Sequence, residues 1–342
     1  MINFDYLRPS SIEEAIKFLQ QYSDRAMLIA GGTDVMVGIK QKKIAPEVLI
    51  SLKGIKGLDY IEPYHEGVRI GALATHRQIG ESSLIRERFS ALADGVDHLG
   101  SLQIRNVATI GGNISNGLPS ADTACPLLVF DTQLRITGPH GERALPLREF
   151  YIGPGKTVLR QDEILIEFII PPLPANSESA YWKHARRQAM EITMLGIAMM
   201  LVVEVKNASI LKEAFAKNAT LEELFDSLDL SEIYCHEARI SLGVAAPIPI
   251  RVKSAEETLK GKRLTTQKFL EAGIMASKEA HPRDTMRGAA WYRRKMIEVL
   301  PKRLALRCLE RILFSKERKE LRWTSLFPDF LYPQAWILKA KP

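Results

Sequence analysis

Two short stretches of sequence decide the fold: AGGTD at residues 30–34 and TIGGN at residues 109–113. Successive glycines let backbone N–H groups turn toward a phosphate without obstruction from a Cβ atom, which forms an anion-binding nest. Thr33 adds a hydroxyl to the first stretch and Asn113 adds an amide to the second. A plain turn could explain either stretch alone. Together, two loops of similar build indicate a ligand that carries a diphosphate.

The segments around these loops predict strands and helices in irregular order. The first loop follows a short apolar strand at residues 26–30, and a capped amphipathic helix precedes it at residues 10–22. Further strands are expected at residues 48–50, 67–71, 133–137, 164–170 and 238–244, and helices at residues 75–82, 91–100, 209–228, 253–260, 266–279 and 289–313. Residues 192–205 are a buried strand or helix. This order predicts an α+β protein rather than a doubly wound sheet.

A proline cluster at residues 171–174 is the clearest domain boundary in the chain. It separates a first domain, residues 1–174, from a smaller α+β domain at residues 175–300. The first domain divides near residue 55 into two subdomains, 1–55 and 56–174. The second domain carries a helical insertion at about residues 206–235, and a basic helical tail is expected at residues 301–342.

The common nucleotide-binding fingerprints are absent from the sequence. No G-x-G-x-x-G occurs, so a dinucleotide-binding Rossmann unit is not supported. Gly155-Lys156-Thr157 resembles the end of a P-loop, but Phe150 stands where its first glycine belongs. We therefore interpret it as a turn. No Ser/His/Asp, Cys/His or paired-carboxylate arrangement is apparent, so no catalytic residue is assigned.

Two charged residues near the loops and the domain boundary have alternative interpretations. Lys183, in YWKHARR at residues 181–187, either meets a ligand at the domain junction or belongs to a solvated basic turn. Asp122 either accepts from a ribose or ribityl hydroxyl or caps the following helix.

Charge and cysteine content limit the function classes. Lysine and arginine number 47 against 40 acidic residues, a net charge of +7. Residues 281–342 hold 15 basic and 6 acidic residues, a net of +9, so the other 280 residues carry −2. The basic end is therefore a candidate surface for docking a partner. Cys125, Cys235 and Cys308 are scattered, which indicates neither disulfides nor a metal or iron–sulfur site. With no signal peptide and no membrane-length apolar run, a cytoplasmic protein without membrane contact is expected.

Several stretches, in the order found in one family, are similar to the FAD-binding medium subunit of molybdenum hydroxylases, a group that includes xanthine dehydrogenase and carbon monoxide dehydrogenase. The agreement is continuous to about residue 205. The matching residues are 4–15, 29–40, 69–76, 103–128, 150–157, 163–165, 181–187, 238–251, 256–261 and 288–296. The pairing of AGGTD with TIGGN at this separation is the most specific part.

The resemblance implies two α+β subdomains that hold FAD between them, in a fold like that of the PCMH-type FAD-binding domains, followed by a smaller α+β domain. It places FAD contacts at Leu28, Ile29, Ala30, Gly31, Gly32, Thr33, Asp34, Val35, Gly100, Thr109, Ile110, Gly111, Gly112, Asn113, Asp122, Ile164, Leu165 and Lys183. It also implies an order of electron transfer. A molybdenum-binding large subunit passes electrons to the [2Fe–2S] clusters of a small subunit, and these clusters pass them to the FAD of this chain. The flavin then passes them to NAD+ or another acceptor.

This chain has no group of cysteines for a cluster, so FAD is expected as its only cofactor, with no metal of its own. The insertion at 206–235 is longer than the hairpin usual in the family and is expected to pack on its own domain. The tail beyond Arg311 matches nothing in the family. Two alternatives remain: a stand-alone FAD-dependent reductase of the same superfamily, and a non-catalytic binding module. Nucleic-acid binding is not expected, because no aromatic-interleaved motif accompanies the basic tail.

Overall fold

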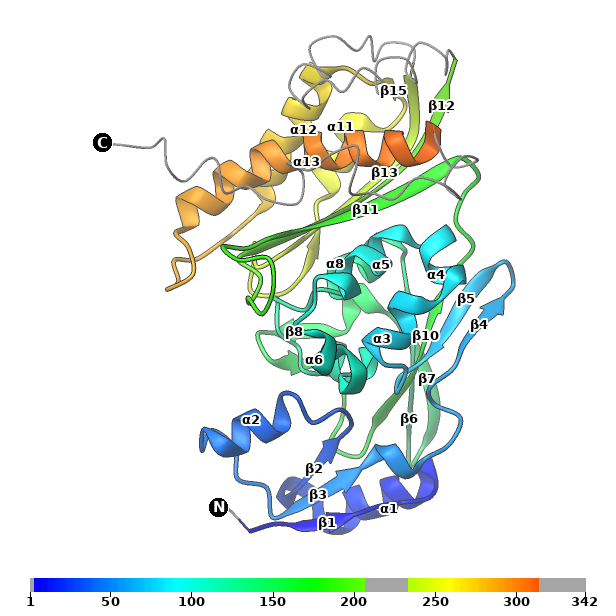
Figure 1. Ribbon diagram of the computed structural model, residues 1–342, viewed down its shortest axis with the longest axis vertical. Helices are drawn as coiled ribbons and strands as arrows, with labels where there is room; N and C mark the ends of the chain where they lie inside the picture. The colour runs from blue at the N-terminus through cyan, green and yellow to red at the C-terminus, as the bar shows by residue number, and fades with distance from the viewer. Residues whose placement is uncertain (1–2, 207–232, 314–342) are drawn as a thin grey trace.

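The computed structural model of the chain describes residues 3–206 and 233–313. Figure 1 shows three units stacked along the longest axis, each built on its own sheet, with the N-terminal unit at one end and the C-terminal unit at the other. The helical region predicted at 209–228 lies outside the described residues, as does the tail from residue 314. The α+β class expected from the sequence is confirmed.

The first unit is a small parallel sheet with the strand order β1-β3-β2. Its strands are β1 (Asp5–Leu7), β2 (Ala26–Ile29) and β3 (Val48–Ser51), and its helices are α1 (Ile12–Tyr22) and α2 (Val35–Lys40). Helix α1 begins where Ser11 Oγ accepts from the backbone N–H of Glu14, and it buries Ala15, Ile16 and Leu19. Parallel pairing directs the chain leaving β2 into the loop at residues 30–34.

The second unit is an antiparallel five-stranded sheet covered by short helices. Its order is β4-β5-β10-β6-β7, so β5 pairs with a strand almost a hundred residues later in the chain. The strands are β4 (Ile61–Tyr64), β5 (Gly67–Gly71), β6 (Gln133–Gly138), β7 (Gly141–Pro146) and β10 (Ile164–Ile170). The helices inserted between β5 and β6 are α3 (His76–Glu81), α4 (Ser83–Arg88), α5 (Ser90–Asp97), α6 (Leu102–Val107), α7 (Ile110–Ser115) and α8 (Ala124–Val129).

Gly155-Lys156-Thr157 belongs to a small hairpin that follows β7. The hairpin strands are β8 (Tyr151–Gly153) and β9 (Lys156–Thr157), and Gly155 has a φ of +69° between them. The interpretation of this segment as a turn, rather than a P-loop, is confirmed.

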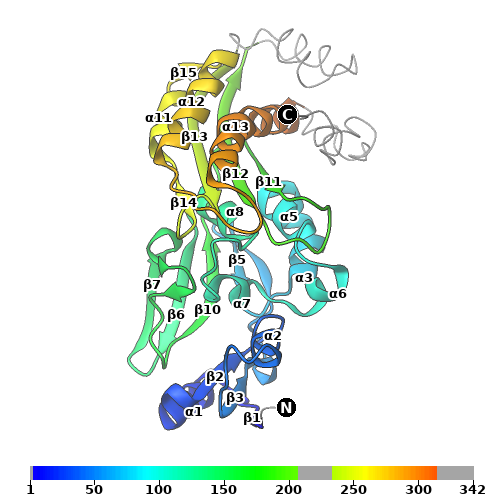
Figure 2. The same ribbon diagram turned by 90° about the vertical axis from the view of Figure 1, so that its left-hand side faces the viewer.

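The third unit is an antiparallel sheet with helices on both faces. Its strands are β11 (Ser177–His184), β12 (Leu195–Val205), β13 (Ile233–Gly243), β14 (Ile250–Arg251) and β15 (Lys262–Arg263). Helices α11 (Lys253–Leu259), α12 (Thr266–Glu279) and α13 (Ala290–Leu313) lie on one face, while α5 and α8 of the second unit pack on the other (Figure 2).

Strand β12 shows why residues 192–205 were open to two interpretations. Leu195, Ile197 and Met199 face the core under α13, whereas Ala198 and Met200 face the core of the second unit. A strand buried on both faces needs apolar residues at every position, so the alternation typical of a half-exposed strand is lost. The structure resolves the ambiguity in favour of a strand.

Helix α13 is continuous across residue 300, where the sequence suggested that a basic tail begins. Leu304, Cys308 and Leu309 are fully buried in the core of the third unit. The helix up to Leu313 therefore belongs to that unit, so residues 301–313 are not part of a separate tail; the rest of the predicted tail lies outside the described residues. In the described ranges, 3–206 and 233–313, no helix has the length and apolarity needed to cross a bilayer.

Candidate functional site

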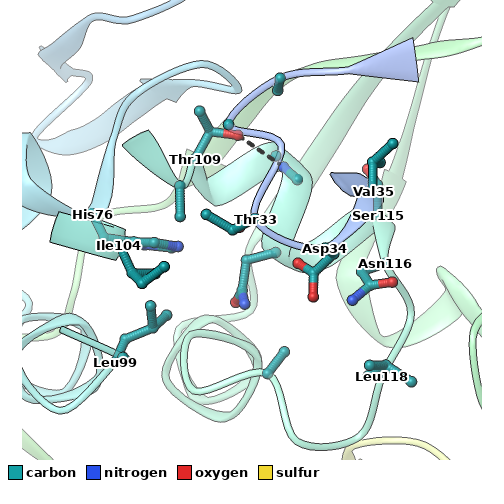
Figure 3. A pocket seen from close by; sticks show the side chains of 18 of the residues that line it. Thr33, Asp34, Val35, His76, Leu99, Ile104, Thr109, Ser115, Asn116 and Leu118 are labelled. Atoms are coloured by element: carbon teal, nitrogen blue, oxygen red, sulfur yellow. Dashed lines mark hydrogen bonds between the residues drawn. The ribbon is translucent and has the colours of Figure 1, made fainter. Parts of the chain in front are cut away.

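A cavity of about 550 Å³ is lined by both glycine loops, which come from different units of the fold (Figure 3). This volume lies in the range of pockets that hold cofactors. Of the eighteen residues predicted to contact a ligand, sixteen line the cavity: Leu28, Ala30, Gly31, Gly32, Thr33, Asp34, Val35, Gly100, Thr109, Gly111, Gly112, Asn113, Asp122, Ile164, Leu165 and Lys183.

The other two, Ile29 and Ile110, are not among the cavity residues. Ile29 is buried with Ile39 and Leu49 in a small apolar cluster of the first unit, and Ile110 is fully buried in the core of the second unit. Each is adjacent in sequence to a residue that lines the cavity, but its own side chain packs inward. A ligand contact predicted for either residue would have to come from its backbone.

Gly31 is required because the two loop regions touch at that point. A Cβ atom on Gly31 would lie 2.2 Å from the carbonyl oxygen of Val107, and Gly32 has a φ of +76°, which side chains disfavour. Within the part of the chain that the structure describes, the backbone N–H groups of residues 31–34 donate no hydrogen bond. The first loop therefore presents free donors at the cavity wall, as an anion-binding nest requires.

The second loop differs, because its backbone N–H groups are already engaged. Ile110 donates to Ala74 O (3.0 Å), Gly111 to Ala72 O (2.9 Å), and Gly112 to Thr109 Oγ1 (3.1 Å). The nest predicted at this loop is therefore not formed by these groups. Gly111 is instead needed for close packing, since a Cβ there would lie 2.6 Å from Ala72 O.

The polar contribution of the second loop comes from the Asn113 side chain. Thr123 Oγ1 donates to Asn113 Oδ1 at 2.6 Å, which fixes the carboxamide and leaves its N–H2 group as a donor for the cavity. The two loops thus offer backbone donors from one side and an amide from the other.

Asp122 and Lys183 form a buried ion pair in the cavity wall. Lys183 Nζ lies 2.8 Å from Asp122 Oδ2, and both side chains are only 6% exposed. Asp122 Oδ1 also accepts from the hydroxyl groups of Tyr181 (2.8 Å) and Thr193 (2.6 Å). Burial, reinforced by the Asp122 charge, raises the pKa of Tyr181 well above its usual value, so this hydroxyl stays protonated.

This geometry excludes one of the two alternatives that the sequence left open for each residue, and the predicted ligand contact stays a prediction for both. Lys183 is not on a solvated turn, and Asp122 does not cap a helix: no side chain caps α8. A second Lys183 N–H donates to His98 O at 3.0 Å. Because an ammonium has three donors, one remains for a ligand.

Glu163 is a buried carboxylate beside the ligand contacts predicted at Ile164 and Leu165. Arg143 binds it through two hydrogen bonds of 2.8 Å, and the backbone N–H of Arg160 adds a third. Hydrogen bonding from Arg143 is the main reason that the pKa of Glu163 is lowered, so the group stays charged. Its partners hold the start of β10 at the cavity edge.

The sequence prediction missed part of the cavity wall. The further lining residues are Leu52, Ala72, Leu73, His76, Leu99, Ile104, Ala108, Ser115, Asn116, Leu118, Ser120, Ala121, Leu159, Glu163, Met190, Glu191, Ile192 and Thr193. Those at 115–121 follow TIGGN directly, in a stretch rich in small polar residues that could have signalled them. His76 and Thr193 had no such signal, because only the tertiary structure brings the start of α3 and the loop before β12 to the cavity.

Two family models match the chain across both of its parts. Residues 2–173 match the FAD binding domain in molybdopterin dehydrogenase, and residues 180–308 match the CO dehydrogenase flavoprotein C-terminal domain. The chain belongs to this family of FAD-binding subunits. The resemblance read from the sequence is thereby confirmed, and FAD is the cofactor of its first domain.

Individual members of the family are similar over most of their length. The xanthine dehydrogenase FAD-binding subunit of Escherichia coli O157:H7 is 33% identical over 87% of this chain and 94% of the relative. The nicotinate dehydrogenase FAD-subunit of Eubacterium barkeri is 29% identical over 91% of this chain and 98% of its own length. The carbon monoxide dehydrogenase structure from Hydrogenophaga pseudoflava matches with a TM-score of 0.79 at 27% identity, covering 90% of this chain and 98% of that one.

Proposed function

We propose that this chain is the FAD-carrying electron-transfer subunit of a heteromeric molybdenum hydroxylase. The observation that carries the proposal is the coincidence of one large cavity with the free N–H groups of residues 31–34, in a chain of this family. Bound FAD supplies reversible one- and two-electron chemistry, while the protein binds and orients it.

The cavity offers each part of FAD a suitable group. Free backbone donors at residues 31–34 and the Asn113 amide suit the diphosphate. The remaining Lys183 donor and the Asp34 carboxylate suit the hydroxyl groups or ring edges of the ligand. Ile164 and Leu165 give an apolar wall against which a ring packs.

The mouth of the cavity supports a role in passing electrons between proteins. Leu118, Met190 and Ile192 line the cavity and are 41%, 57% and 50% exposed. Exposed apolar side chains around a cofactor pocket are typical of a surface that a partner covers. We place there the small [2Fe–2S] subunit that delivers electrons from a molybdenum-binding large subunit, with NAD+ or another acceptor taking them from FAD.

Spectroscopy of the purified full chain tests the proposal. We expect oxidised-flavin absorbance and release of FAD on denaturation; release of FMN, or of no flavin, would overturn the assignment. Purification under native conditions should bring down two further subunits, one with iron–sulfur absorbance. If instead the chain alone reduces a substrate with a nicotinamide donor, it is the stand-alone reductase.

A further inference from the structure

His76 is a buried imidazole in the cavity wall that has no hydrogen-bond partner. It is the first residue of α3, whose start is held by the Thr75–Gln78 capping box and by the His76 N–H bond to Ala108 O (3.0 Å). The residue is 1% exposed, and within residues 3–206 and 233–313 neither Nδ1 nor Nε2 is hydrogen-bonded. Buried polar groups are nearly always paired, so this exception calls for an explanation.

The His76 ring is uncharged. Burial, with a smaller contribution from the nearby Arg105 guanidinium, lowers the pKa of His76 to about 3. A neutral imidazole offers one N–H donor and one nitrogen acceptor. That pair suits the edge of an uncharged heteroaromatic ring better than a phosphate, which favours cations and multiple donors.

The surroundings of His76 suit the faces of such a ring. Figure 3 shows His76, Leu99 and Ile104 together on one side of the cavity, with Asn116 and Leu118 on the other. Leu99 and Ala108 are 8% and 7% exposed, whereas Leu118 is 41% exposed. Ile104 is half-buried, so the His76 side is the more buried, apolar end of the cavity, and the Leu118 side is the more open end.

We propose that His76 binds the adenine ring of FAD through a hydrogen bond to its edge, with Leu99, Ile104 and Ala108 packed around the ring. The proposal rests on the proposed function. FAD has two heteroaromatic rings, and the flavin must reach other proteins to exchange electrons, which places it at the open mouth. The adenine takes no part in electron transfer, so it can occupy the more buried end of the cavity, where the imidazole has no partner.

The full chain, stripped of flavin, tests this assignment by titration with FAD, FMN and ADP. We expect H76L to bind FAD about tenfold more weakly, the effect of one lost hydrogen bond, and ADP more weakly as well. FMN, which lacks the adenosine half, should bind H76L as it binds the original chain. H76N, which restores a donor and an acceptor, should recover part of the FAD affinity, and H140L, at an exposed position, should change nothing.

The melting temperature of the flavin-free chain separates ligand binding from a structural role. A partnerless polar group contributes nothing to folding, so H76L should melt at the same temperature as the original chain or higher. A flavin-free H76L chain that melts lower or fails to fold would contradict the proposal, as would unchanged FAD affinity. Equal weakening of FMN and FAD would place the contact on the flavin half instead. Failure of the original chain to bind FAD would overturn the proposed function itself.

Discussion

Lys183 Nζ and Asp122 Oδ2 lie 2.8 Å apart at the junction of β11 with the loop after α7, both almost fully buried. A buried ion pair adds little folding stability compared with an apolar pair of similar volume. Removing one partner, however, leaves a charge that water cannot reach. The pair therefore joins the second and third units at the cavity wall and makes each residue depend on the other.

Replacing one partner of this ion pair should lower both the stability of the chain and its retention of FAD. We expect K183M or D122N to lower the free energy of unfolding by about 3–5 kcal/mol and to reduce FAD retention, because the other group loses its partner. The double variant should lose less than the sum of the two. Urea unfolding followed by circular dichroism measures this, with flavin content determined on the same samples.

The matched control is K268M, because Lys268 and Glu271 form a pair of 2.6 Å with side chains 36% and 37% exposed. K268M should lower the free energy of unfolding by less than about 1 kcal/mol. Equal losses for K183M and K268M would contradict the importance assigned to burial.

Gly31→Val should abolish FAD retention. Its Cβ would overlap the Val107 carbonyl, so the first loop must move away from α6 and take its free N–H groups with it. We expect stability to fall by about 1–3 kcal/mol as well. Flavin absorbance per chain and thermal melting are the measurements.

Gly153→Val serves as its control, since a Cβ there meets nothing closer than 3.9 Å. That variant should keep its flavin. A G31V chain with full flavin content would refute the close approach of the two loops as a requirement for binding.

Asp94 joins α5 of the second unit to α13 of the third. Arg307 and Arg311 reach Asp94 Oδ1 at 3.0 and 2.8 Å, and the Asp94 side chain is 9% exposed. The two guanidinium groups outweigh the effect of burial and hold the pKa of Asp94 at about 2. We expect D94N to lower the free energy of unfolding by about 3 kcal/mol and to release α13 first, which amide hydrogen exchange would reveal.

For comparison, Asp97 makes an exposed pair with Arg86 at 3.0 Å. D97N should lower the free energy of unfolding by less than about 1 kcal/mol and leave amide hydrogen exchange in α13 unchanged. If the amides of α13 exchange as slowly in D94N as in D97N, the ion pairs of Asp94 with Arg307 and Arg311 do not hold this helix in place.

Acid should destabilise the flavin-free chain well before its carboxylates protonate. Burial is the main cause that lowers the pKa of His76 to about 3 and of His184 to about 4, whereas both residues titrate near 6.5 when unfolded. The unfolded chain then binds more protons, so stability is fully present above pH 6.5 and is lost as pH falls toward 4 and 3. Each histidine should lower the free energy of unfolding by on the order of 1–2 kcal/mol between pH 8 and pH 5.

Melting temperatures measured from pH 8 to pH 5 check this prediction. H76L removes one of the two groups, so its stability should fall less steeply over that interval. Parallel curves for H76L and the original chain would exclude His76 as a source of the acid sensitivity.

The basic C-terminal end shows that net charge alone does not predict a docking surface. The net charge of +9 in residues 281–342 suggested a docking surface, but Arg293 and Arg311 are buried and Arg307 is half-buried. Arg293 donates to Met194 O at 2.8 Å, and the other two pair with Asp94. Composition does not distinguish a solvated arginine from one that pairs with a carboxylate two hundred residues away.

The sequence by itself determined the α+β class, the two glycine loops and the family, because these depend on local signals: hydrophobic period, glycine spacing and the order of motifs. Only the tertiary structure decided which loop has free N–H groups, that Lys183 and Asp122 pair with each other, and that His76 lies in the cavity. Those properties depend on contacts between residues far apart in the chain. Burial and partner choice are set when the three sheets pack, and no local pattern encodes them.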